Sequence, residues 1–220
     1  MKSNTLNRAR GFTLIELLVV ISIIVILASL TTVTVTSVRV RVKQAVAKAR
    51  FAEYVAAIKL CESDNGYAPD FGIEPNGTSG DLIFPDVSGA DSDWTDFWKT
   101  LYALKSPDES GAGAFESLER DQARELGNPK RRKYLMPSDD NHHLDQAGDL
   151  DWTTIKGMYD SKKKAREQVF LVIDLDGDGR FENPDPRSRN KHEYINKTVG
   201  FYSREVKGGS LGKVLFSTWN

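Results

Sequence analysis

The sequence has little of the chemistry that enzymes and disulfide-stabilised domains need. Its one cysteine, Cys61, cannot form a disulfide within the chain, so other contacts must hold the fold together. Cys61 lies among small residues at the end of a helical pattern, and we expect a packed side chain rather than a reactive or intermolecularly bridged thiol. No Walker loop and no H-E-x-x-H pair is present. The sequence therefore does not predict an enzyme.

Near the N-terminus one stretch lacks acidic residues and the next lacks charge of either sign. Residues 1–10 contain three basic residues and no acidic one, which is the positive flank that stays cytoplasmic when an apolar segment enters a membrane. Leu17–Val38 contains no charge, and about 22 helical residues reach roughly 33 Å, near the roughly 30 Å of bilayer hydrocarbon. This pattern predicts a single membrane-spanning helix.

One acid interrupts the apolar region at its start. Glu16 lies where a membrane helix would enter the hydrocarbon, and a carboxylate there costs a few kcal/mol unless it finds a partner. A secretory signal peptide gives no reason for this acid, and its cleavage site would follow the apolar run. No A-x-A pattern directly follows the apolar run, where Leu30 leads into Thr31-Thr32-Val33-Thr34. The boundary that stands out is Gly11-Phe12, before the run.

The stretch around this boundary is Arg10-Gly11-Phe12-Thr13-Leu14-Ile15-Glu16. It resembles the class III prepilin signal of type IV pilins and type II secretion pseudopilins. The resemblance implies cleavage after Gly11 by a prepilin peptidase and methylation of the new amino group on Phe12. It also implies that Glu16 pairs with the N-terminal ammonium of a neighbouring subunit. Two charges that are each costly in lipid become tolerable when paired. The alternative is an uncleaved signal anchor with a stray acid.

One long helix is expected from Phe12 onward. Apolar residues recur at spacings of three and four, at Val38, Val42, Ala45, Ala49, Ala52 and Ala56. Thr31–Val42 alternates like a strand, but a strand leaving the bilayer would lack a partner for its edge, so we expect helix. The helix should end at Asp64-Asn65-Gly66. The expected parts are a cleaved leader (1–11), a transmembrane or filament-core helix (12–38), the periplasmic half of the helix (39–63) and a globular head (64–220).

The head is expected to combine short helices with a small antiparallel sheet. Asp93 fits the N-cap of a short helix over 94–104, whose aromatic residues should pack on the long helix. A second helix is expected over 115–126, and residues 138–167 are polar and loop-like. Strands are expected at about 168–175, 198–204 and 213–219. The fold class is therefore α+β, the type IV pilin-like fold that the resemblance also implies.

The best chemical motif in the head is an acid-rich loop beginning at Asp174. Counted from Asp174, acids fall at positions 1, 3, 5, 9 and 12 with Gly179 at position 6, which is nearly the calcium loop of an EF-hand. Asp185 replaces the usual Glu at position 12, and Pro184 and Pro186 prevent a straightforward exiting helix. The candidate ligands are Asp174, Asp176, Asp178, Arg180 (by its carbonyl), Glu182 and Asp185.

Calcium is therefore the cofactor that we expect, against the alternative of an acidic turn that only caps a strand. Many major pseudopilins bind calcium in a head loop, so the resemblance supports the metal but not these individual ligands. His142 and His143 could ligate zinc, but adjacent side chains in a loop point apart, and a solvated loop is favoured.

Nucleic acid is not an expected partner. The formal net charge is −1, and removing the leader with its three basic side chains would leave −4. The basic runs 130–133 and 162–164 are therefore interpreted as solvated faces or subunit contacts rather than as sites for DNA or anionic lipid.

The functional expectation is a structural subunit of a type II secretion pseudopilus, anchored in the inner membrane with its head in the periplasm. Its partners would be copies of itself, other pseudopilins, the prepilin peptidase, an inner-membrane assembly platform and membrane lipid. A subunit of a type IV pilus or DNA-uptake (competence) filament is a close alternative. A membrane-tethered head that binds calcium or carbohydrate and never polymerises is an alternative of another class.

Overall fold

The structure is a computed structural model that describes residues 12–73, 80–85, 93–110, 115–145, 148–158, 167–183, 194–207 and 210–219, without the side chains of 30–37. The chain divides into two compact units, Met1–Val42 and Lys43–Asn220.

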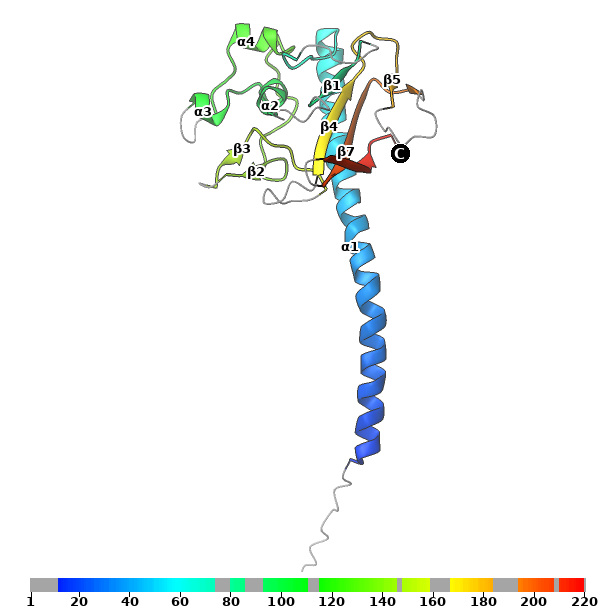
Figure 1. The fold of residues 1–220 in the computed structure, drawn as a ribbon. Coiled ribbons are helices and arrows are strands. Elements are labelled where there is room, and N and C mark those ends of the chain that lie inside the picture. The colour runs from blue at the N-terminus through cyan, green and yellow to red at the C-terminus, as the bar shows by residue number, and fades with distance from the viewer. Residues whose placement is uncertain are drawn as a thin grey trace, which may run out of the picture. The chain divides into compact units, whose positions relative to one another are not determined.

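The first unit contains the N-terminal part of helix α1 (Leu14–Asn65), a continuous helix of 52 residues (Figure 1). The alternating segment Thr31–Val42 is helical, because the weak strand preference of Val and Thr is overridden by its context. Every large apolar side chain of Leu14–Leu27 is exposed. Among the described residues, no helix meets the length and hydropathy that crossing a membrane requires.

In the second unit, α1 buries one face in the head. Five buried side chains recur at spacings of three and four, namely Ala47, Phe51, Tyr54, Ile58 and Cys61, and Ala57 beside Ile58 is also buried. The alanines that gave the sequence its helical pattern, Ala45, Ala49, Ala52 and Ala56, are exposed instead. Large aromatic side chains remove more apolar area from water than alanines do, so they determine which face packs.

A four-stranded antiparallel sheet, ordered β1-β4-β7-β8, packs with this part of α1 (Figure 1). Its strands are β1 (Leu82–Phe84), β4 (Glu167–Ile173), β7 (Val199–Lys207) and β8 (Ser210–Ser217). The last three correspond to the three expected strands, whereas β1 lies in a Gly- and Pro-rich stretch and was missed. The α+β, pilin-like fold class is confirmed.

An aromatic cluster fills the space between α1, the sheet and helix α2 (Thr95–Tyr102). The Phe51 ring lies 4.9 Å from that of Phe201 and 5.1 Å from that of Phe216, measured between centroids. Tyr54 and Trp98 meet edge to face at 5.4 Å. This confirms the core role expected for the aromatic residues of α2.

Two helix predictions differ from the structure. Asp93 does accept the Thr95 N–H at 2.9 Å, but Trp94 occupies the N-cap position and makes no side-chain cap bond. The helix expected over 115–126 is only α4 (Arg120–Glu125), because residues 116–118 instead pair with residues 103–105. A further short helix, α3 (Pro107–Ser110), lies between α2 and α4.

The segment expected to be a solvated loop is partly buried. Within it lie the short strands β2 (His143–Leu144) and β3 (Leu150–Asp151), which pair antiparallel. His142 and Trp152 beside them are buried, so the expectation of a solvated loop at His142 is wrong. A second small ribbon pairs β5 (Phe181–Glu182) with β6 (Tyr194–Ile195).

Candidate assembly site and acidic loop

The start of α1 is closed by a reciprocal pair of residues. The backbone N–H and the hydroxyl of Thr13 both donate to Glu16 Oε2 at 2.8 Å, and the Glu16 N–H donates to Thr13 Oγ1 at 3.3 Å. Thr13 precedes the first helical residue and Glu16 is the third, so this is a capping box that satisfies two orphan donors of the helix. The acid that looked costly in the sequence thus has a local structural role.

The capping box leaves part of Glu16 available. Its Oε1 atom has no hydrogen-bond partner among the described residues, and both Glu16 and Phe12 are exposed. Gly11, the other residue of the expected cleavage boundary, lies outside the described residues. A cation could approach Oε1 without breaking the bonds to Thr13.

A second group of acids forms at one end of the sheet. Strand β1 pairs with β4 in a register that sets Leu82 opposite Ile173, so the preceding Asp81 and the following Asp174 come together. The carboxylate oxygens of Asp81, Asp174 and Asp176 lie within 4.8 Å of one another. Asp81 and Asp174 are buried and Asp176 is exposed. Hard oxygen ligands at this separation suit a divalent cation such as calcium.

Asp174 organises the loop through both of its carboxylate oxygens. Oδ1 accepts the Gly177 N–H and Oδ2 accepts the Gly179 N–H, each at 2.8 Å. Burial raises the pKa of Asp174, the two backbone N–H groups oppose that effect, and the neighbouring Asp176 carboxylate raises the pKa further. A bound cation would favour the charged forms of all these acids.

Among the described acids, Asp178 and Glu182 do not belong to this group. Asp178 pairs with Arg180 at 2.8 Å, and this hydrogen bond lowers the pKa of Asp178. The Arg180 guanidinium also lies 4.4 Å from the centre of the Tyr194 ring. Glu182 lies in β5. Asp185 lies outside the described residues.

The sequence motif therefore identified two members of the acidic group, Asp174 and Asp176, and missed Asp81. Asp81 is about 90 residues away in sequence, and only the pairing of β1 with β4 brings it close. The sequence does hint at a strand after Asp81, because an apolar triplet follows it directly. Three residues are too few for periodicity to predict a strand.

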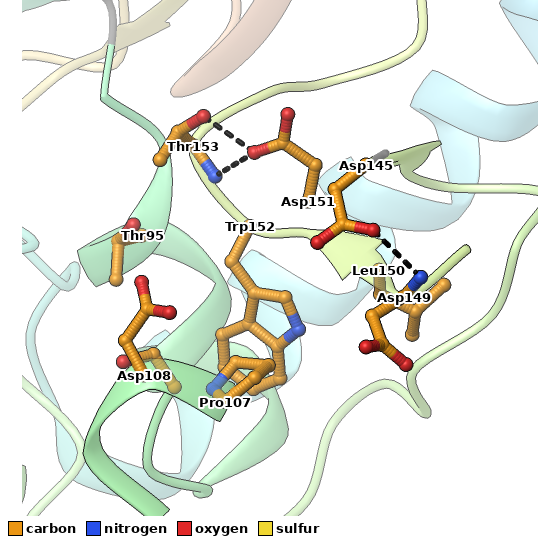
Figure 2. Close-up of a pocket in the computed structure, with 10 residues that line it drawn as sticks. Thr95, Pro107, Asp108, Asp145, Asp149, Leu150, Asp151, Trp152 and Thr153 are labelled. Atoms are coloured by element: carbon orange, nitrogen blue, oxygen red, sulfur yellow. Dashed lines mark hydrogen bonds between the residues drawn. The ribbon is translucent and has the colours of Figure 1, made fainter. Parts of the chain in front are cut away.

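A pocket of about 360 Å³ lies beside the β2–β3 hairpin (Figure 2). Its lining includes four aspartates, Asp108, Asp145, Asp149 and Asp151. Asp151 Oδ1 accepts the N–H and hydroxyl of Thr153, and Asp145 Oδ1 accepts the Asp149 N–H at 2.9 Å. These bonds are local turn contacts. Among the described residues, only the group at Asp81 brings three metal-ligating atoms together.

Of the comparisons with known proteins, one gave a match, and it covers the N-terminal sequence. Residues 6–32 match the family model of the prokaryotic N-terminal methylation motif. Comparison with curated proteins and with solved structures gave no match.

The motif and the α+β fold define a type IV pilin-like protein. Such a signal implies processing by a prepilin peptidase and assembly into a pilin-type filament. The match, over residues 6–32, supports a pilin-like filament subunit and suggests a membrane-anchored, surface or periplasmic filament protein.

Proposed function

We propose that the chain is a structural subunit of a type II secretion pseudopilus, assembling through its N-terminal helix into a periplasmic filament that drives protein export. The observation that carries the proposal is the methylation motif, whose match over residues 6–32 includes the start of α1, where every large apolar side chain of Leu14–Leu27 is exposed. Apolar surface of this extent needs a partner, either membrane lipid or other subunits. Glu16 supplies a polar contact to a neighbouring subunit within this apolar surface.

A secretion pseudopilus is favoured over a surface pilus or DNA-uptake filament by features of the head. The chain has no cysteine pair, and Cys61 is buried. The acidic loop offers a different means of stabilising the head, through a cation. In this assignment the helix enters the inner membrane, the head lies in the periplasm, and an inner-membrane platform and other pseudopilins are the partners.

The assembly role of Glu16 is tested by Glu16→Ala. We expect normal membrane insertion but at least about tenfold less filament, because breaking a desolvated charge pair costs several kcal/mol. The measurement is the ladder of crosslinked subunit multimers in membranes by immunoblot, beside the amount of processed subunit.

Two further variants separate charge pairing from helix capping. Glu16→Gln keeps an oxygen that can accept from Thr13 but loses the charge, so it should fail to assemble. Thr13→Ala removes the capping hydroxyl and should still assemble. Normal filaments from Glu16→Gln would contradict the proposed pairing of the Glu16 carboxylate with a neighbouring subunit's N-terminal ammonium.

We also propose that Asp81, Asp174 and Asp176 bind calcium in the head. Their grouped carboxylate oxygens support this, whereas Asp178 is engaged by Arg180. At about 100 times Kd, calcium would stabilise the folded chain by about 2.7 kcal/mol. The expected result is a rise in Tm of several degrees on adding calcium after chelation, measured by calorimetry on the full chain.

Asp81→Asn and Asp174→Asn should each remove this calcium-dependent shift. Asp178→Asn is the matched control, since its carboxylate lies outside the group, and it should keep the shift. An unchanged Tm for the wild type at millimolar calcium would remove the calcium proposal.

A further inference from the structure

A buried histidine lies at the junction between the β2–β3 hairpin and the rest of the head. His142 has no exposed surface, and aromatic rings surround it. The centroid of its ring lies 4.3 Å from that of Trp98, 5.7 Å from that of Tyr102 and 5.9 Å from that of Trp152. Trp98 and Tyr102 belong to α2, whereas Trp152 follows β3.

The hydrogen bonds of His142 fix it in one neutral form. Nδ1 lies 3.1 Å from the carbonyl oxygen of Asp151, which only accepts, so Nδ1 carries the proton. Nε2 then accepts from the Tyr102 hydroxyl at 2.8 Å. A second proton on Nε2 would leave the Tyr102 O–H without this acceptor.

Other contacts of the same segment lie around this histidine. We call residues 138–145 and 148–158 the hairpin segment. Asn141 Oδ1 accepts the Tyr54 hydroxyl at 2.9 Å, and the Trp98 indole N–H donates to the Thr154 carbonyl at 3.0 Å. Arg50 of α1 donates to the carbonyls of residues 156 and 157 at 3.2 and 3.3 Å. His142 is thus one of a few polar contacts that dock the segment on α1 and α2.

The charged surroundings do little to favour a protonated ring. Burial is the main cause that lowers the pKa of His142, to about 4, and Lys156 and His143 act in the same direction. Asp151 opposes them, although its Oδ1 atom already accepts two bonds from Thr153. From the other elements, α1 places the Arg50 guanidinium on the carbonyls of residues 156 and 157 and the Tyr54 hydroxyl on Asn141, and α2 places the Tyr102 hydroxyl on His142.

We propose that His142 is a pH-sensitive latch, which holds the hairpin segment on the head when neutral and releases it when protonated. The direction of the pH dependence follows from the number of protons that each form binds. A released His142 has the ordinary pKa of about 6.5, so the released form binds more protons than the docked form between about pH 6.5 and about pH 4. The docked form is fully stable above that window and loses stability as the pH falls through it.

The test is hydrogen exchange of the full-length protein in detergent at about pH 7.5 and about pH 5.0, corrected for intrinsic exchange rates. From the two pKa values, the ratio of released to docked segment should rise about 30-fold between these conditions. Protection in the hairpin segment should fall accordingly. Protection in β4 and β7 should stay high, because the latch opens one segment rather than the head.

Matched variants assign the effect to one histidine. His142→Asn removes the titration, so its hairpin protection should be independent of pH whatever its level at neutral pH. His143→Asn changes the adjacent residue and should keep the full pH response. Three results would overturn the latch: no loss of protection in the wild type, the same loss in His142→Asn, or simultaneous loss of protection in β4.

Discussion

Asn128 shows how a single polar side chain can hold several segments together. It is fully buried, and its Nδ2 donates to the carbonyls of Thr100 at 2.7 Å and Arg132 at 2.9 Å. Its Oδ1 accepts the Arg132 N–H at 3.2 Å. Both sides of the amide are therefore used, which links the turn after α4 to α2.

Asn128→Ala should destabilise the head by about 2–4 kcal/mol, because it leaves buried carbonyl and N–H groups without partners. Chemical denaturation of the full chain measures the loss. Asn196→Ala is the control at an exposed position and should stay within about 0.5 kcal/mol of the wild type. Equal stability of the two variants would contradict the structural role of Asn128.

Single residues were predicted unevenly from the sequence. Cys61 is buried as expected, and its burial raises the pKa of the thiol to about 11, so the thiol is not a ready nucleophile. His142 was wrongly assigned to a solvated loop, because its neighbours in sequence are polar. Its burial depends on Trp98 and Tyr102, which are about 40 residues away and come near only through the tertiary fold.

Elements with a long repeating pattern were predicted best. The spacing of apolar residues gave α1, and alternation or continuous apolar runs gave β4, β7 and β8. The orientation of α1 was harder, because it has two faces that both look apolar in sequence. Phe51 and Tyr54 lie on one, and the exposed alanines lie on the other.

Short elements left too little signal in the sequence. Strand β1 has three residues, and each strand of the β2–β3 and β5–β6 ribbons has two. The position of β1 is set by pairing with β4, about 90 residues later, and those of β2 and β5 by pairing with equally short strands. The acidic group was found only in part for this reason, since Asp81 depends on β1.

At the scale of the whole molecule, one unit contains the buried core and the other contains the exposed apolar helix. Among the described residues, every buried hydrophobic side chain lies at or beyond Ala47, within the second unit. The first unit contributes an exposed apolar helix and the methylation motif. Assembly and folding are therefore expected to depend on different parts of the sequence.

Deleting residues 1–42 should accordingly leave a folded, soluble head. The sheet, α2 and the buried face of α1 all remain in the shortened chain, so its apolar core is intact. We expect a single cooperative unfolding transition with a Tm within a few degrees of that of the full chain in detergent, measured by circular dichroism. The shortened chain should not enter filaments when expressed with the wild type. If it unfolded without cooperativity, the first unit would be supplying stability to the head, and assembly defects in its variants would have to be separated from misfolding.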